Sequence, residues 1–219
     1  MERASFYHKE FPNFPPLRAD NRWLDGIWVL GNNYKGSGYY GAYPPNYLKR
    51  ITSLFPDATE ILHLFSGSLP KGNYVRFDLH GADINGDAHE LNHYFEGDIF
   101  DLVLVDPPYS QEDAEHYGTP LINRNKVLLE CYKVTQSGGY IVWLDQVLPM
   151  FRKTELYLCG LIGIVRSTNH RFRVASIFKV LYEYKSRISY YQRATKFGSN
   201  YSRKLPLLCT TLRIYGKTN

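Results

Sequence analysis

Apolar runs with the length of buried strands recur through the middle of the chain. Phe100–Val105 is rich in Val and Leu and contains no glycine, and Glu60–Phe65 and Tyr140–Asp145 have a similar pattern. Apolar runs of this length are typical of strands that are buried on both faces of a parallel sheet. Tyr74–Leu79 alternates between apolar and polar residues, which predicts a further strand. The pattern therefore predicts an α/β fold built on a parallel sheet.

Two segments carry apolar residues at helical spacing. They are residues 46–55, with Tyr47, Leu48, Ile51, Leu54 and Phe55, and residues 123–136, with Val127, Leu128, Cys131 and Val134. Each segment predicts an amphipathic helix, and two glycines at 138 and 139 stop the second one. Only residues 66–73 separate the first two predicted strands, which is short for a helical crossover. The first crossover helix is therefore expected to be reduced or absent.

The two ends of the chain differ from this middle part. Residues 1–25 show no clean period and contain three prolines, which predicts an irregular arm. The strand-like runs 157–165 and 173–182 are separated only by residues 166–172, which predicts an antiparallel hairpin. The chain thus divides into an arm and loop over residues 1–45, a main domain over 46–184 and an appendage over 185–219.

Charge is distributed unevenly along the 219 residues. Residues 57–145 carry 15 acidic and 5 basic side chains, whereas residues 146–219 carry 14 basic and 2 acidic ones. Aromatic residues make up 16% of the chain, and in the appendage they alternate with Lys and Arg. Basic charge together with aromatic rings is typical of a surface that binds nucleic acid. The alternative is a solvated basic face on a structural appendage.

Other bulk features favour a cytoplasmic protein with no membrane association. No window approaches the roughly 18 uninterrupted apolar residues of a membrane span, and the amino terminus does not resemble a signal peptide. Cys131, Cys159 and Cys209 are odd in number and far apart, which favours free thiols in a reducing compartment. Their spacing predicts no metal site.

A tetrad with two prolines follows the central predicted strand. Asp106, Pro107, Pro108 and Tyr109 come directly after Phe100–Val105. Because proline cannot donate to a strand ladder and restricts the backbone, the strand ends at Asp106 and a stiff turn follows. Asp106 and Tyr109 are therefore expected at the carboxyl edge of the sheet, where open α/β folds bind their ligands.

This tetrad resembles motif IV of the amino-methyltransferases, the S-adenosylmethionine-dependent enzymes that methylate the exocyclic amine of adenine or cytosine. In the catalytic role that the resemblance implies, the Asp106 carboxylate and the Pro107 carbonyl accept the amine hydrogens. Tyr109 offers a ring on which a base taken out of its helix can stack. The alternative is that the tetrad only ends a core strand and that Tyr109 packs on a neighbour.

Two segments before the tetrad resemble motifs that hold the methionine end of the cofactor. Phe65-Ser66-Gly67-Ser68 follows the first predicted strand and resembles motif I, although Leu69 stands at its second glycine. A glycine in such a turn lets the backbone approach a ligand. The Gly- and Tyr-rich loop with Tyr40, Tyr43 and Pro44 looks like motif X, with a plain surface loop as the alternative.

Three acids are candidates for the rest of the cofactor site. The resemblance assigns Asp78, at the end of the second predicted strand, to the ribose hydroxyls, and Asp83 is the rival acid for this role. Asp87 and Ala88 look like motif III, whose acid accepts a hydrogen bond from the adenine amine. Asp106 is expected to border the cofactor as well.

Basic residues gather at the tip of the predicted hairpin. In this family the sixth strand runs parallel to the fourth, so the tip lies on the same edge as Asp106. The residues expected to meet the nucleic acid are Arg166, Asn169, His170, Arg171 and Arg173. Phosphate contact is the preferred role of these arginines, with solubility as the alternative. The polar run 110–120 is expected to form a loop over the site.

The resemblance implies a class I methyltransferase sheet with helices on both faces and S-adenosylmethionine as the cofactor. Its preferred substrate is the N6 amine of adenine in DNA, as in the adenine-specific enzymes of restriction-modification systems. RNA is the alternative substrate, and a non-catalytic subunit that binds nucleic acid is a second alternative. Since no large target-recognition domain is evident, a homodimer or a partner chain that supplies specificity stays open.

Overall fold

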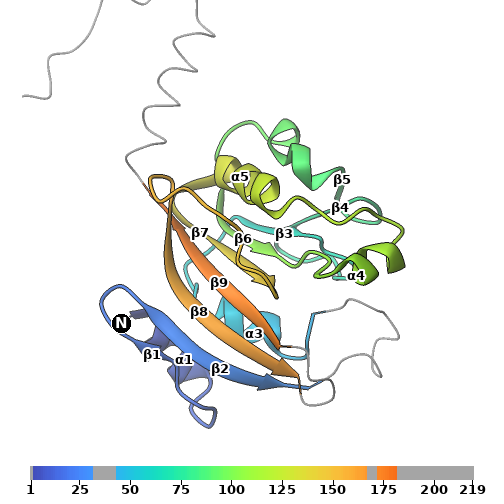
Figure 1. Ribbon diagram of the computed structural model, residues 1–219. Helices are drawn as coiled ribbons and strands as arrows, with labels where there is room; N and C mark the ends of the chain where they lie inside the picture. The colour runs from blue at the N-terminus through green and yellow to red at the C-terminus, as the bar shows by residue number, and fades with distance from the viewer. Residues whose placement is uncertain (1, 32–42, 167–171, 182–219) are drawn as a thin grey trace, which may run out of the picture. The chain divides into compact units, whose positions relative to one another are not determined.

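The computed structural model describes residues 2–31, 43–166 and 172–181 (Figure 1). These residues form one mixed sheet with the strand order β1-β2-β8-β9-β7-β6-β3-β4-β5. The strands are β1 Arg18–Ala19, β2 Leu24–Leu30, β3 Ile61–Leu64, β4 Val75–Asp78, β5 Ile84–Asn85, β6 Phe100–Val105, β7 Thr135–Asp145, β8 Leu156–Arg166 and β9 Phe172–Val180. The helices are α1 Glu2–Glu10, α3 Tyr47–Thr52, the 3-10 helix η1 Ala88–Tyr94, α4 Gln111–His116 and α5 Arg124–Val134.

The centre of the sheet is parallel, and its last hairpin is antiparallel. The strands β5, β4, β3, β6 and β7 run parallel to one another, whereas β9 lies antiparallel between β7 and β8. Residues 65–74, which join β3 to β4, contain no helix. The fold is therefore a Rossmann-like α/β sheet with a terminal antiparallel hairpin and a reduced first crossover, as predicted.

Helices cover both faces of the sheet, and each face buries its own apolar cluster (Figure 1). On one face, α1 and α3 pack on β2, β8 and β9 around the fully buried Trp28. On the other face, η1 and α5 pack on β3, β6 and β7 around Trp143. Because β6 contributes side chains to both clusters, it reads as a continuous apolar run in the sequence. Burial of each Val, Leu, Ile or Phe side chain in these clusters stabilises the fold by about 1.5–3 kcal/mol.

The expectation of an irregular amino-terminal arm over residues 1–25 is wrong for the segments that form α1, β1 and the start of β2. In α1, Ala4 and Tyr7 are buried, Phe11 directly after the helix is buried as well, and the Tyr7 ring stacks on Trp28 with ring centroids 5.4 Å apart. The strand β2 pairs in parallel with β8 and so extends the sheet. The helical period escaped detection because only two residues of this short helix are buried. The described arm is thus part of the hydrophobic core.

Two other segments differ from the sequence prediction. The polar run 110–120, which was expected to be a loop, contains the short helix α4, whose first turn is capped by Ser110 Oγ accepting from the Asp113 amide at 3.1 Å. The strand β7 begins at Thr135, directly after α5, and not at Tyr140. Both differences lie at element boundaries and leave the predicted order of elements unchanged.

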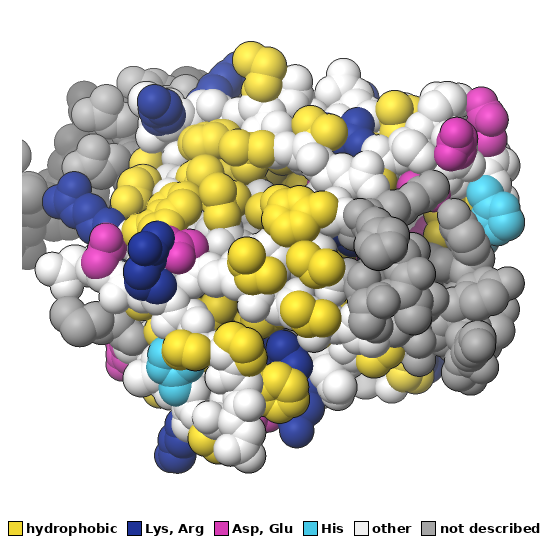
Figure 2. Space-filling view, turned by 60° about the horizontal axis from the view of Figure 1, so that its bottom comes forward, with side chains coloured by type: hydrophobic (Ala, Val, Ile, Leu, Met, Phe, Trp, Pro, Cys, Tyr) yellow, Lys and Arg dark blue, Asp and Glu magenta, His cyan; other side chains and the backbone are white. Residues whose placement is uncertain are grey.

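Apolar side chains also gather on the surface that comes forward in Figure 2. On β2, Ile27 and Val29 point away from the core and are exposed by 59% and 63%. In the described ranges, no helix has both the length and the apolar content needed to span a bilayer. The thiols of Cys131 and Cys159 are free, and burial raises the pKa of both, for Cys159 to about 11.

Candidate active site

The Asp-Pro-Pro-Tyr tetrad lies at the carboxyl edge of the sheet, beside the end of β3. The Asp106 amide donates to the Leu64 carbonyl at 3.4 Å, and after this bond the chain leaves the ladder. The Tyr109 hydroxyl donates to Asp106 Oδ1. Burial raises the pKa of Tyr109 well above its usual value, and the Asp106 charge raises it further. Tyr109 is therefore protonated at neutral pH and acts as a donor toward the carboxylate.

Arg173 covers the ring of this tyrosine. Its guanidinium carbon lies 4.2 Å from the centroid of the Tyr109 ring, and the residue is only 8% exposed. Tyr47 belongs to the same cluster. Burial raises the pKa of Tyr47 most, the Asp106 charge raises it further, and the Arg173 charge lowers it. The hairpin strand β9 and the helix α3 thus both reach the tetrad, as the parallel arrangement of β6 and β8 predicted for the hairpin.

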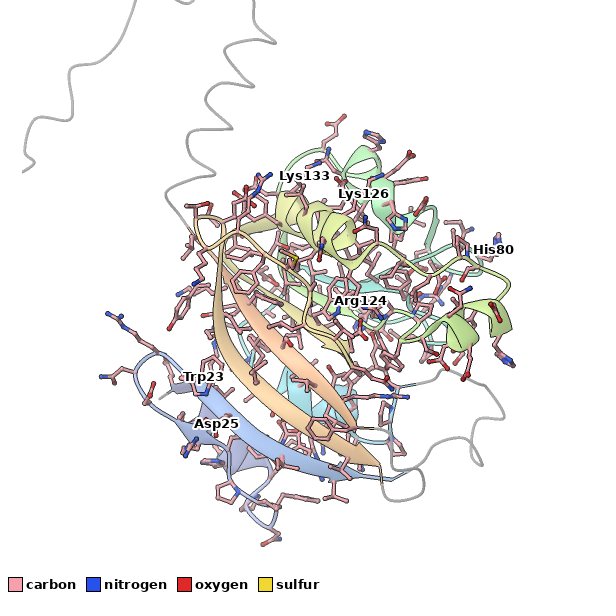
Figure 3. All side chains as sticks on the ribbon, viewed as in Figure 1. Trp23, Asp25, His80, Arg124, Lys126 and Lys133 are labelled. Atoms are coloured by element: carbon pink, nitrogen blue, oxygen red, sulfur yellow. The ribbon has the colours of Figure 1, made fainter. Side chains whose placement is uncertain are left out.

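Arg124, which sequence reasoning did not single out, holds the backbone of the tetrad. Its Nη2 donates to the Tyr109 carbonyl at 2.7 Å, and its Nε donates to Asp145 Oδ2 at 2.7 Å. The Asp145 side chain is only 1% exposed and also accepts from Trp143 Nε1 and from the Gln146 amide. Figure 3 shows Arg124 below α5, near the middle of the molecule. The contact joins α5, β7 and the tetrad.

The motif I segment forms a tight turn beside Asp78. Phe65 and Gly67 have φ of 60° and 51°, so a residue other than glycine adopts the left-handed conformation here. Such backbone strain is concentrated at functional sites. The Gly67 amide donates to Asp78 Oδ2 at 2.8 Å, and the Leu79 amide donates to Oδ1 at 2.7 Å. Asp78 is therefore the acid that the structure places against the motif I turn.

Asp83, the rival acid, has a different partner. Both of its carboxylate oxygens accept from the Arg76 guanidinium, at 2.8 and 3.0 Å, and Oδ2 also accepts from the Arg76 amide at 3.1 Å. This ion pair lowers the pKa of Asp83. The structure therefore gives Asp83 a structural role and leaves Asp78 as the candidate for the ribose hydroxyls.

Three buried polar atoms near the end of β3 find no hydrogen-bond partner among the described residues: Tyr43 Oη, Ser66 Oγ and His63 Nδ1. Tyr43 stacks on Tyr47 and lies close enough to Asp106 and Asp78 for both carboxylates to raise its pKa, after the larger effect of burial. A bound polar ligand would satisfy such atoms. The motif I turn, Asp78 and these atoms thus fit S-adenosylmethionine.

The remaining cofactor candidates surround this region or fall outside it. Asp87 caps η1 by accepting from the His89 amide at 2.9 Å, and Ala88 behind it is buried. Pro44 is buried, and its carbonyl accepts from the Tyr47 amide at 3.0 Å. Ser68 is exposed, and Tyr40 lies outside the described residues.

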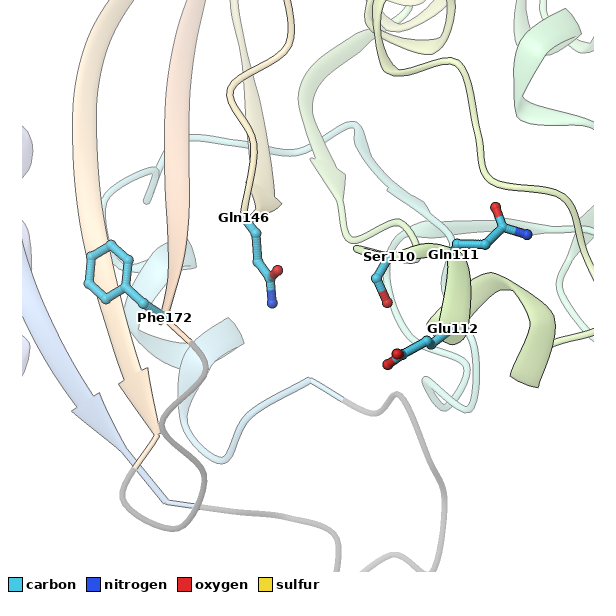
Figure 4. A pocket seen from close by; sticks show the side chains of 5 residues that line it. All are labelled: Ser110, Gln111, Glu112, Gln146 and Phe172. Atoms are coloured by element: carbon cyan, nitrogen blue, oxygen red, sulfur yellow. The ribbon is translucent and has the colours of Figure 1, made fainter.

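A pocket of about 490 Å³ opens beside the tetrad (Figure 4). It is lined by Ser110, Gln111, Glu112, Gln146 and Phe172. The lining joins the start of α4 to the end of β7 and the start of β9, so residues 110–112 of the polar run 110–120 belong to it. Residues 65–68 do not contribute to this pocket. Hydrogen-bonding side chains with one aromatic ring suit a planar polar ligand.

The predicted nucleic-acid residues are only partly described. Arg166 ends β8, and Asn169, His170 and Arg171 lie outside the described residues. Arg173, which was predicted to contact phosphate from the hairpin tip, is buried over Tyr109. Its position follows from the register, since it pairs with Ile164 two residues before the end of β8.

Comparison with known proteins adds little to this geometry. No protein-family model matches the chain, and no curated protein matches it. Among solved structures, TrmN from Thermus thermophilus has a TM-score of 0.45 and 13% identity, over 64% of this chain and 49% of TrmN. A structure titled "Conversion of a Disulfide Bond into a Thioacetal Group during Echinomycin Biosynthesis" has a TM-score of 0.38 and 11% identity, over 71% of this chain and 88% of that one. The chain thus spans about half the length of TrmN.

Proposed function

We propose that this protein transfers a methyl group from S-adenosylmethionine to the exocyclic amine of a base in nucleic acid, with N6 of adenine in DNA as the first candidate. The observation that carries the proposal is the position of Asp106. Its carboxylate ends the central strand β6, adjoins the end of β3 and already accepts a hydrogen bond from a hydroxyl group. The adjacent motif I turn and its orphaned polar atoms supply a place for the cofactor.

The tetrad can activate an amine that is conjugated to an aromatic ring. Asp106 Oδ1 is an acceptor, and the Pro107 carbonyl belongs to a residue with no N–H group of its own, so each can accept one amine hydrogen. The lone pair is then directed out of the ring plane. Tyr109 supplies a rigid ring for stacking. When bound, S-adenosylmethionine supplies an electrophilic methyl group, and the protein supplies orientation and placed charge.

Adenine is placed before cytosine because the tetrad begins with Asp, which is commoner among the adenine enzymes of this family, whereas Ser is frequent among the cytosine enzymes. Similar tetrads also serve RNA enzymes, so the substrate is tested directly. Methyl incorporation from labelled S-adenosylmethionine is measured on duplex DNA, single-stranded DNA and total RNA, and the products are digested to nucleosides for mass spectrometry. If N6-methyladenosine formed in RNA alone, RNA would take the place of DNA as the proposed substrate. No transfer to any of the three would overturn the proposal.

The decisive variant is Asp106→Ala. It should reduce methyl transfer at least about 100-fold, as expected when a placed electrostatic group is lost, with little change in the affinity for S-adenosylhomocysteine. Asp101→Asn is the control, because Asp101 lies at the opposite end of β6, where its carboxylate accepts from the Thr59 amide at 2.8 Å. The control should keep its turnover within about threefold. Near-normal turnover of Asp106→Ala would end the assignment.

A further inference from the structure

The guanidinium group of Arg173, which lies over the Tyr109 ring, is buried in the described structure. Arg173 is 92% buried, and its Nε finds no hydrogen-bond partner among the described residues. A buried cation is costly unless it is compensated. The Tyr109 ring, 4.2 Å from the guanidinium carbon, provides part of that compensation through a cation–π contact. The pair is therefore a built feature of the site, not a chance surface contact.

Tyr109 is held in three ways. Arg173 covers one face of its ring, its hydroxyl donates to Asp106, and its carbonyl accepts from Arg124. Arg173 therefore blocks one ring face, and a base that stacks on Tyr109 must use the other. The amine of that base must also take the place of the tyrosine hydroxyl on Asp106 Oδ1.

We infer that Arg173 is a positioning residue of this site: it fixes the Tyr109 ring so that one face receives the substrate base. This inference rests on the proposed function and deepens it. Arg173 acts through Tyr109, which distinguishes it from the phosphate-binding arginine expected from the sequence. The loss of its charge should therefore affect the base more than the cofactor, because most of the cofactor candidates lie in the turn after β3, at the end of β4 and at the start of η1.

The test compares Arg173→Met and Arg173→Lys with a matched control. Lys179→Met lies on the same strand and removes a cation 5.7 Å from the centroid of the Tyr140 ring. We expect Arg173→Met to lower kcat about tenfold and to raise KM for the nucleic acid, with an unchanged affinity for S-adenosylhomocysteine. Arg173→Lys should recover part of the loss, and Lys179→Met should match the wild type. Equal kinetics of Arg173→Met and the wild type would overturn the inference while the proposed function stands.

Variants of the tyrosine separate the ring from its hydroxyl. Tyr109→Phe keeps the ring and should retain transfer within about fivefold, whereas Tyr109→Leu should lose much more. Equal losses in these two variants would also overturn the inference. Thermal unfolding of the ligand-free protein tests the contact independently of activity: Arg173→Met and Tyr109→Leu together should lower Tm by about 2–4 °C less than the sum of the single effects. Additive losses would show that the two side chains do not interact.

If the wild type methylates no nucleic acid, the proposed function fails, and the inference about base stacking fails with it. This outcome is distinguishable from failure of the inference alone, because the wild type is measured first on all three nucleic acids. The unfolding measurements need no substrate.

Discussion

Replacement of Arg124 by Met should destabilise the protein strongly, because it leaves a carboxylate buried without its cation. Asp145 is 1% exposed in its side chain, and Arg124 is 15% exposed, with 2.7 Å between Nε and Oδ2. Removal of one partner of a buried ion pair costs about 3–5 kcal/mol. Asp145 keeps hydrogen bonds from Trp143 Nε1 at 3.2 Å and from the Gln146 amide at 2.6 Å. The cost should therefore lie near the lower limit, about 3 kcal/mol.

For a chain of this length, 1 kcal/mol corresponds to about 2–4 °C in Tm, so Arg124→Met should lower Tm by roughly 6–12 °C in a calorimetric or fluorescence melt. Arg18→Met is the matched control. Arg18 makes an ion pair with Asp25 at 2.9 Å on the surface, where its side chain is 84% exposed. Since exposed pairs contribute little, this variant should melt within about 2 °C of the wild type.

A second substitution tests the cause of the loss. In Arg124→Met combined with Asp145→Asn, neither member of this pair is charged, and the single Asn side-chain oxygen can still accept from either Trp143 Nε1 or the Gln146 amide. The double variant should regain several degrees relative to Arg124→Met. The reasoning is refuted if the double variant melts no higher than Arg124→Met, or if Arg124→Met melts within about 3 °C of the wild type. Transfer activity should fall with Arg124→Met as well, because Arg124 also holds the Tyr109 carbonyl.

Three further predictions follow from particular residues. Burial lowers the pKa of His63 from 6.5 to about 4, so between these pH values the unfolded chain binds more protons than the folded one. The free energy of unfolding should therefore fall by up to about 3 kcal/mol as the pH drops from 6.5 to 4. The curve of Tm against pH should be flatter for His63→Asn than for the wild type, and parallel curves would contradict the role of His63. A Cβ at Gly160 would lie 2.8 Å from a backbone oxygen of β2, whereas a Cβ at Gly163 would lie 2.9 Å from an exposed side-chain ring that can move. In denaturant unfolding, Gly160→Ala should therefore lower the free energy of unfolding by about 1–3 kcal/mol, and Gly163→Ala should lower it less. Asp78→Ala should weaken S-adenosylhomocysteine at least tenfold in calorimetry, and Asp83→Ala should leave its affinity unchanged; the reverse result would exchange the two acids.

The centre of the fold was predictable because its strands are buried on both faces. β3, β6 and β7 appear as apolar runs, and the short spacing between β3 and β4 already excluded a long crossover helix. β2 was missed for the opposite reason. It contains Asp25 and Gly26, exposes Ile27 and Val29, and pairs with β8, which lies far away in the sequence. Its local pattern therefore differs from that of a buried strand.

The location of the site was predictable, but the contacts that hold it were not. A proline pair after a buried strand places the tetrad at the sheet edge, and this required only local information. Arg124 and Arg173 contact Tyr109 from α5 and β9, so their roles depend on tertiary packing. One local signal was available: Arg124 lies in the first turn of a helix, where the dipole disfavours a cation. A charge in such a place indicates a partner elsewhere.

Arg124 and Arg173 hold the tetrad at a place where the two prolines leave no backbone donors. Pro107 and Pro108 have no N–H groups, so the chain after Asp106 cannot be held by ladder hydrogen bonds. The last bond of this kind is the long one, 3.4 Å, from the Asp106 amide to the Leu64 carbonyl. Beyond it, Tyr109 must be held from outside, and Arg124 binds its carbonyl while Arg173 covers its ring. The geometry of the proposed active site therefore depends on the packing of α5 and β9 against β6, so substitutions that loosen either element should lower transfer without touching the tetrad.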